Sequence, residues 1–376
     1  MKVSQQIHQA GQSIWYDNVE RRLLNNGDLA AMITRGEILG VTSNPTIFMN
    51  AITRSHDYDT ALAPLAKAGK SGEEIFWELA IEDIQAAADL LRPIYDASNK
   101  ADGYVSLEVN PYLANDTQAT LSEAKRLWKR VDRPNLMVKI PATVEGLPAI
   151  LSAIEAGINV NVTLIFSRER YWAVMEMYIS GLSRRAAKGL PIDSIASVAS
   201  FFVSRVDTKV DGLLNGMIDR GGARAEKAAQ FLGQAAIATA RLAYHDFKLI
   251  FGSERFAQLR ALGGRAQRPL WASTGTKNPV YRDVVYIEEL VGKDTVNTVP
   301  PATLAAFLDH GMVRPDSLEE DLPGAYQAMA RLEALGISMA NVTAELEAEG
   351  VKSFAGAWKA LMDAMEVSRK AALGEE

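Results

Sequence analysis

Cysteine is absent from the 376-residue sequence. This absence excludes disulfide bonds, thiolate nucleophiles and metal centres that need cysteine ligands. Histidine is scarce, and the four histidines lie far apart without the spacing of a zinc-binding motif: His8, His56, His245 and His310. We therefore expect no histidine-rich metal site.

Long apolar segments and an excess of basic residues are also missing. No apolar stretch approaches the roughly 18 residues that a membrane span needs, and the first residues lack the apolar core of a secretion signal. The 46 acidic and 40 basic residues give a net charge of -6, which provides no general attraction to nucleic acid or to anionic membranes. We predict a cytoplasmic protein that binds neither nucleic acid nor membrane.

Short apolar segments rich in β-branched residues alternate with longer segments of helical periodicity, among them 73–91, 119–131, 147–155 and 168–187. Strands that are apolar on both faces and separated by helices indicate a parallel sheet covered by helices. Eight such strands predict a closed (β/α)8 barrel, the TIM barrel, rather than an open doubly wound sheet. The predicted strands are 13–16, 40–43, 105–109, 136–140, 158–165, 195–202, 269–273 and 295–299.

Two regions are larger than a simple barrel requires. The interval 48–102 is too long for one helix, so we expect one or two additional helices after the second strand. Residues 301–376 are rich in Ala, Leu and Glu, and predict helices at 303–310, 317–335 and 353–372 that pack on the barrel or cover its mouth. No low-complexity linker is present. We expect a single domain, 1–376, with 301–376 as a C-terminal helical extension.

Polar side chains occur at or near the ends of seven of the eight predicted strands. In such barrels the active site forms at the carboxyl ends of the strands, and burying a polar group without a partner costs several kcal/mol. These side chains are therefore expected to converge on one site. They are Asp17, Ser43, Asn44, Glu108, Asn110, Lys139, Asn161, Thr163, Ser200 and Ser273.

Lys139 is the strongest catalytic candidate, because it ends the apolar run Leu136-Met137-Val138 and is followed by Ile140-Pro141. Desolvation disfavours the charged form of an amine, and the neutral form attacks ketones to give Schiff bases. Glu108, one strand earlier, is expected to lie close enough to relay protons. The alternative is that Glu108 and Lys139 form a purely structural buried ion pair.

The other candidates have plausible structural roles as well. Asp17 is suited to general acid–base chemistry, but also to capping a helix that begins near Asn18. Asn44 precedes a proline, which is common in turns. Arg205 and Lys277 follow the sixth and seventh strands, and the small hydroxyl-rich loop before Lys277 suits phosphate binding. A solvated loop is the alternative there, since no P-loop or dinucleotide-binding motif is present.

Four strand motifs, in this order, resemble those of the transaldolases, in particular the longer bacterial subfamily. The resemblance covers roughly residues 17–299 and implies a (β/α)8 barrel of the class I aldolase type without metal or organic cofactor. The motifs are Gly40-Val41-Thr42-Ser43-Asn44-Pro45-Thr46-Ile47-Phe48, Val105-Ser106-Leu107-Glu108-Val109, Met137-Val138-Lys139-Ile140-Pro141-Ala142-Thr143 and Asn159-Val160-Asn161-Val162-Thr163-Leu164-Ile165-Phe166-Ser167.

The resemblance also implies a role for each candidate. Lys139 matches the Schiff-base lysine, Asp17 the acid–base group, and Glu108 with Thr163 the pair that positions a water molecule. The groups that match substrate-binding positions are Asn44, Asn161 and Ser200 for the dihydroxyacetone hydroxyls, and Arg205 and Ser273 for the phosphate end. The sequence departs from many transaldolases after Ser273, where Thr274-Gly275-Thr276-Lys277 stands in place of a second arginine. Lys277 is expected to supply that charge.

The activity that the resemblance implies is transfer of a dihydroxyacetone unit in the pentose phosphate pathway. The donors are sedoheptulose 7-phosphate and fructose 6-phosphate, and the acceptors are glyceraldehyde 3-phosphate and erythrose 4-phosphate. Two alternatives remain at this stage: an aldolase that only cleaves fructose 6-phosphate, and a barrel that binds sugar phosphates without chemistry. Apolar faces on the terminal helices are compatible with a homodimer.

Overall fold

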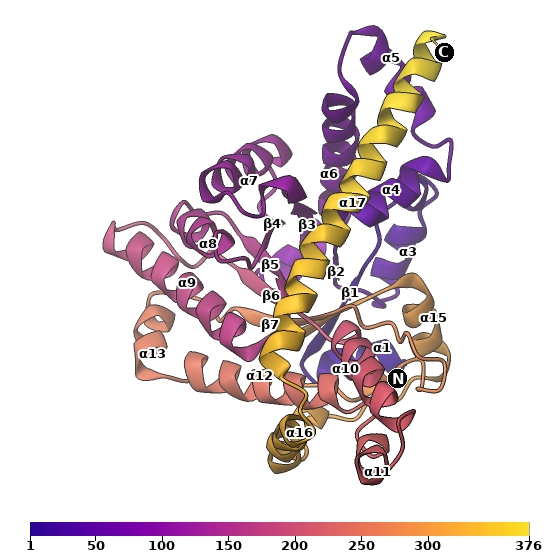
Figure 1. The fold of residues 1–376 in the computed structure, drawn as a ribbon. Coiled ribbons are helices and arrows are strands. Elements are labelled where there is room, and N and C mark those ends of the chain that lie inside the picture. Colours follow the sequence, from indigo (N-terminus) through magenta and orange to yellow (C-terminus); the bar gives the residue numbers. More distant parts are fainter. Residues whose placement is uncertain (376) are drawn as a thin grey trace.

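The computed structural model describes residues 1–375. Eight parallel strands form a closed barrel in chain order, with β8 paired to β1 (Figure 1). The predicted (β/α)8 fold is confirmed. The strands are β1 (Gln12–Tyr16), β2 (Gly40–Val41), β3 (Val105–Glu108), β4 (Leu136–Pro141), β5 (Val160–Ile165), β6 (Ser197–Phe202), β7 (Arg268–Ala272) and β8 (Thr295–Val299).

Close packing and a polar network stabilise the barrel around Trp15 in β1. A Cβ atom on Gly40 of β2 would lie 2.7 Å from the Trp15 indole, so only glycine leaves room for this ring. The indole N–H donates to Asp102 Oδ1 at 2.9 Å, and Arg268 pairs with the same carboxylate at 3.3 Å. These charges are buried but paired, which avoids the cost of desolvating an isolated ion.

Helices surround the barrel and follow most of the strands. Three helices, α4, α5 and α6, lie between β2 and β3, which confirms the expected additions after the second strand. The helices up to β8 are α1 (Val3–Gln9), α2 (Arg21–Asn25), α3 (Asp28–Thr34), α4 (Pro45–Thr53), α5 (Asp59–Lys67), α6 (Gly72–Ala97), α7 (Thr117–Val131), α8 (Gly146–Glu155), α9 (Arg168–Ala187), α10 (Ser204–Ile218), α11 (Ala223–Ala229), α12 (Ala235–Phe251), α13 (Glu254–Ala261) and α14 (Val285–Glu288), with a short 3-10 helix at Pro111–Leu113. Among residues 1–375, no helix combines the length and apolarity needed to cross a bilayer.

The C-terminal extension contains α15 (Pro301–His310), a 3-10 turn (Ser317–Glu319), α16 (Leu322–Ala334) and α17 (Met339–Leu373). The prediction of one helix over 317–335 is wrong. Asp321 adopts a left-handed φ of 51° and Pro323 follows at the start of α16. A left-handed residue does not continue a helix. Asp321 instead caps α16, since its carboxylate accepts from the Gly324 N–H at 2.9 Å, and Pro323 is tolerated in the first turn, where no N–H is needed.

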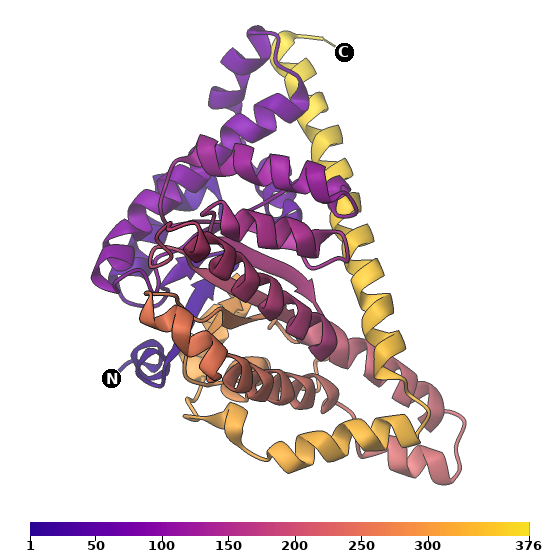
Figure 2. The same ribbon diagram turned by 90° about the vertical axis from the view of Figure 1, so that its left-hand side faces the viewer.

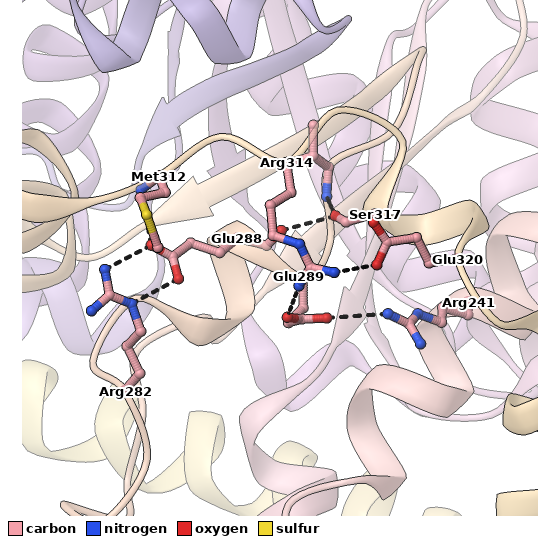
Figure 3. A network of polar contacts seen from close by, with 9 residues as sticks. Arg241, Arg282, Glu288, Glu289, Met312, Arg314, Ser317 and Glu320 are labelled. Atoms are coloured by element: carbon pink, nitrogen blue, oxygen red, sulfur yellow. Dashed lines mark hydrogen bonds and ion pairs between the residues drawn. The ribbon is translucent and has the colours of Figure 1, made fainter.

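A polar network fixes residues 312–320 to the barrel side (Figure 3). Ser317 Oγ donates to the Glu288 carbonyl at 2.9 Å, and Arg282 pairs with the Glu288 carboxylate at 2.7 Å. Arg314 bridges Glu289 and Glu320. These contacts hold the segment that leads from α15 into α16.

The last helix, α17, is longer than predicted: it begins at Met339 rather than near residue 353, and has 35 residues. Figure 1 shows it crossing in front of the barrel, and Figure 2 shows it running the height of the molecule along one side. It contacts α4, α5 and α6, and also α10 and β5. Of the two expected placements, the structure therefore has a C-terminal helix that covers the barrel mouth.

Candidate active site

A cavity of about 140 Å³ lies at the carboxyl ends of the strands, beneath α17. Eight of the ten predicted site residues line it: Asp17, Asn44, Lys139, Thr163, Ser200, Arg205, Ser273 and Lys277. The other two, Glu108 and Asn161, contact Lys139 and Ser200. The structure therefore brings together the ten residues to which the resemblance assigned a role. Asn110, which was also expected to converge on the site, instead caps the 3-10 helix after β3, where its Oδ1 accepts from the Tyr112 N–H at 3.0 Å.

The barrel register places Lys139 of β4 directly between Glu108 of β3 and Asn161 of β5. The Lys139 side chain is nearly fully buried, and its Nζ lies 3.1 Å from Glu108 Oε2. Nζ donates a hydrogen bond to the Ser43 carbonyl at 3.3 Å. By distance, Lys139 and Glu108 form an ion pair. Their geometry does not meet the angle of a hydrogen bond, and Glu108 Oε2 therefore has no hydrogen-bond partner among the described residues.

Two carboxyl groups share the site with the Lys139 amine, and both are shifted toward the protonated form. Burial raises the pKa of Glu108 against the opposing charge of Lys139, and the charge of Asp17 raises it further. Burial also raises the pKa of Asp17, against the charge of Lys139 and a hydrogen bond from Thr42. Groups shifted toward neutral pH are suited to exchanging protons with a substrate.

Asp17 lies immediately after β1, with its carboxylate held at the cavity. Its Oδ1 accepts a hydrogen bond from Thr42 Oγ1 at 2.7 Å, and Thr42 Oγ1 also lies 2.5 Å from Thr298 Oγ1. The next helix, α2, begins only after Glu20. The alternative that Asp17 caps a helix at Asn18 is therefore wrong.

Asn44 begins α4 rather than forming a turn. Its Oδ1 accepts from the Ile47 N–H at 3.0 Å, and Pro45 occupies the first helical position. Both are favourable at a helix start. The cap fixes the orientation of the Asn44 amide at the edge of the cavity.

Asn161 and Ser200 form a hydrogen-bonded pair on adjacent strands. Ser200 Oγ donates to Asn161 Oδ1 at 2.7 Å, and Asn161 Nδ2 donates to Ser106 Oγ at 3.0 Å. The buried amide is thus held from two sides. Ser200 is the member of the pair that lines the cavity.

Thr163 faces the cavity beside a bulge in β5. The register between β5 and β6 shifts between Val162 and Ile165, and Leu164 has a left-handed φ of 60°. Bulges re-aim side chains next to active sites. The Thr163 hydroxyl is buried and has no hydrogen-bond partner within residues 1–375, so it is available to a water molecule or a substrate.

Two cationic side chains lie on the part of the cavity wall that is formed by the segments after β6 and β7. Arg205 in α10 packs its guanidinium 5.3 Å from the Phe202 ring centroid, and burial lowers its pKa while Glu349 opposes that shift. Lys277 is exposed at the rim. Neither cation is ion-paired with an acidic side chain in the described chain. Ser273 lies between them with its Oγ 3.0 Å from Ser204 Oγ, so this part of the cavity is suited to an anion.

Comparison with known proteins identifies the family. A family model described as Transaldolase/Fructose-6-phosphate aldolase matches residues 14–365. The transaldolase of Saccharopolyspora erythraea is 50% identical over 356 residues, which cover 95% of this chain and 94% of the relative. The transaldolase of Thermobifida fusca is 48% identical over 359 residues, 96% of each chain.

The chain belongs to the transaldolase/fructose-6-phosphate aldolase family. This confirms the family and the transferase class predicted from the strand motifs. The match ends at residue 365 and so includes most of α17, beyond the region 17–299 that the motifs covered. Within residues 1–375 of this family member, no three His, Asp or Glu side chains are grouped as metal ligands.

Sequence reasoning missed several residues of the cavity: Thr42, Phe202, Ala272, Gly275, Thr298, Pro300 and Phe354. Thr298 could have been found, because it is a polar side chain near the end of the one strand to which no site residue was assigned. Phe354 could not. It belongs to α17, and its ring centroid lies 5.5 Å from Lys139 Nζ.

Proposed function

We propose that this protein is a cytoplasmic transaldolase of the pentose phosphate pathway that works through a Schiff base on Lys139. The donors are sedoheptulose 7-phosphate and fructose 6-phosphate, and the acceptors are glyceraldehyde 3-phosphate and erythrose 4-phosphate. The observation that carries the proposal is a buried amine 3.1 Å from the Glu108 carboxyl, in a cavity that Asp17 and two unpaired cations also line, with the pKa of both carboxyls raised.

The first step joins the enzyme to the donor. Lys139 Nζ attacks the C2 carbonyl, and loss of water gives the protonated imine. Glu108, 3.1 Å from Nζ and with a raised pKa, gives its proton to the carbonyl oxygen as the amine attacks. It then takes a proton from the amine and passes it to the new hydroxyl, which leaves as water. Thr163, whose hydroxyl is unpartnered, holds the water molecule that relays these protons.

The second step breaks the C3–C4 bond. Asp17 removes the proton of the C4 hydroxyl, C4 becomes an aldehyde, and the bonding electrons pass from C3 into the imine. The imine is the electron sink for this cleavage. The aldehyde product then leaves, and the three-carbon unit stays bound to Lys139.

The remaining steps reverse these changes on the acceptor. C3 of the bound unit forms a bond to the acceptor aldehyde carbon, whose oxygen takes the proton from Asp17. Water then hydrolyses the imine and frees Lys139. Asn44, Asn161 and Ser200 hold the hydroxyls of the three-carbon unit.

The sugar phosphate is bound at the cationic part of the cavity wall. Arg205 and Lys277 supply positive charge there, and Ser273 supplies a hydroxyl. Arginine suits this role because its planar guanidinium matches phosphate geometry.

A simple fructose 6-phosphate aldolase is the nearer alternative, since the family description includes that activity. Comparing dihydroxyacetone release with transfer to an acceptor separates the two. Loss of activity on dialysis against EDTA would indicate a metal-dependent aldolase instead. A barrel that only binds sugar phosphates predicts that Lys139→Ala keeps every activity of the wild type.

The decisive experiment is borohydride reduction in the presence of fructose 6-phosphate, followed by peptide mass mapping. We expect a label on Lys139 alone. Lys277 lines the same cavity and is an internal control for nonspecific labelling. A label on another lysine, or none, contradicts the proposal.

A further inference from the structure

The helix α17 places one aromatic ring over the Lys139 amine. Phe354 lines the cavity, its side chain is buried, and its ring centroid lies 5.5 Å from Nζ. Phe354 comes from the C-terminal extension, whereas Lys139 is on a barrel strand. The extension therefore takes part in forming the cavity around the reacting nitrogen.

Contacts one helical turn before and one helical turn after Phe354 fix its position. Trp358 packs against Phe76 and Trp77 of α6, with ring centroids 5.1 and 5.4 Å away. Gly350 lies against β5, where a Cβ atom would be 2.9 Å from Leu164 Cδ2. Residues four apart share a helix face, so both contacts hold the same face of α17 against the barrel.

Ion pairs fix the amino-terminal half of α17 as well. Lys209 of α10 contacts Glu345 and Glu349 at 2.7 and 2.6 Å. Arg170 of α9 contacts Glu347 at 3.2 Å. The helix is thus attached on both sides of Phe354, which keeps the ring in place.

Transfer requires that water does not protonate the intermediate on Lys139 before the acceptor reacts. After C3–C4 cleavage, the carbanion has two fates. In release, C3 takes a proton and water hydrolyses the imine, which gives free dihydroxyacetone and the free amine. In transfer, C3 bonds to the acceptor carbon, Asp17 returns its proton to the new C4 oxygen, and water then hydrolyses the imine in the same way. The two fates therefore differ in whether C3 takes a proton or bonds to the acceptor. Excluding water from the intermediate suppresses release.

We propose that Phe354 is a specificity-determining residue that keeps water from protonating C3 of the intermediate on Lys139 and so favours transfer over release. This inference rests on the proposed transaldolase function. The ring acts through its apolar bulk, because it covers a nitrogen whose other near neighbours, the Glu108 carboxylate and the Ser43 carbonyl, are polar.

The test measures free dihydroxyacetone released per donor cleaved, with an acceptor aldehyde present, in Phe354→Ala, Phe354→Leu and Leu361→Ala. This ratio does not depend on the overall rate. We expect Phe354→Ala to raise this ratio about tenfold, because the barrier to release falls relative to the barrier to transfer. Phe354→Leu keeps apolar bulk without a ring and should stay near the wild-type value. Leu361→Ala alters a buried residue of the same helix away from the cavity and should not change it.

Each variant is also reduced with borohydride to confirm that Lys139 is labelled. A wild-type ratio in a labelled Phe354→Ala enzyme overturns the inference. An equal rise in Leu361→Ala overturns it too, since the effect would then come from loosening α17. A rise of the same size in Phe354→Leu shows that the ring itself, rather than its bulk, matters, and rejects shielding. Failure to label Lys139 in the wild type rejects the transaldolase mechanism itself, which is a distinguishable result.

Discussion

Glu108 Oε2 lies 3.1 Å from Lys139 Nζ, and the two side chains project from paired positions on adjacent strands. A lysine paired with a carboxylate in a barrel core is compatible with a purely structural ion pair. The free acceptor position on Oε2, the unpartnered Thr163 hydroxyl and the cavity beside Lys139 favour a catalytic role.

Glu108→Gln should slow imine formation while preserving the shape of the site. The amide cannot accept the proton of the attacking amine, so we expect kcat to fall about 10²- to 10⁴-fold, the usual contribution of general acid–base catalysis. Rapid-quench borohydride trapping measures the rate of imine formation. A variant with unchanged trapping kinetics would assign Glu108 to the structural ion pair.

Thr42→Val should move the acidic limb of the kcat/KM profile to higher pH. Asp17 acts as a base only when ionised, and burial already raises its pKa. The Thr42 hydrogen bond stabilises the ionised form and lowers that pKa. Its loss therefore raises the pKa of Asp17 further, and activity appears at higher pH.

The matched control for this shift is Thr298→Val. Thr298 contacts the Thr42 hydroxyl rather than Asp17, so we expect a smaller displacement. Equal displacement by both variants, or none by Thr42→Val, would assign the acidic limb to another group.

Lys277→Met should weaken binding of phosphorylated donors specifically. A hydrogen bond to a charged group contributes about 1.5–3 kcal/mol, so KM for fructose 6-phosphate should rise about 10- to 100-fold. The kinetic constants for unphosphorylated fructose should change little. Lys209→Met is the control, because Lys209 is occupied by Glu345 and Glu349. Equal losses with both sugars would exclude a phosphate contact.

Trp358→Ala should destabilise the fold by removing the contacts of α17 with α6. Truncating a buried tryptophan costs about 3–5 kcal/mol, measured as the free energy of unfolding in urea. Val367→Ala, at a 68% exposed position of the same helix, should change it by less than about 0.5 kcal/mol. A small effect of Trp358→Ala would mean that α17 is held mainly by its other contacts.

The barrel and most of its site were predictable because both follow from repeated local rules. Alternating apolar strands and helices indicated the fold, and the polar side chains at strand ends indicated the site. Asp17 shows the limit of such rules, since helix capping and catalysis favour the same residue type at the same place. The structure separated them by starting α2 after Glu20.

The course of α17 and the bulge in β5 could not be predicted. Composition indicates that a C-terminal helix forms but not which surface it packs on, because its partners are distant in sequence. The β5 bulge depends on a left-handed residue that is leucine rather than glycine, so the sequence carries no local signal for it. The single-domain partition and the homodimer stay predictions.

Gly350 is the residue of α17 that packs against Leu164 of β5, one helical turn from Phe354. A methyl group there would press on Leu164 at 2.9 Å, and either the helix or the leucine must shift. A shift of the helix displaces Phe354 one turn away, whereas rotation of the Leu164 side chain leaves Phe354 in place. Gly350, which lies outside the cavity, is therefore the position that lets α17 approach β5 closely enough to bring Phe354 to Lys139.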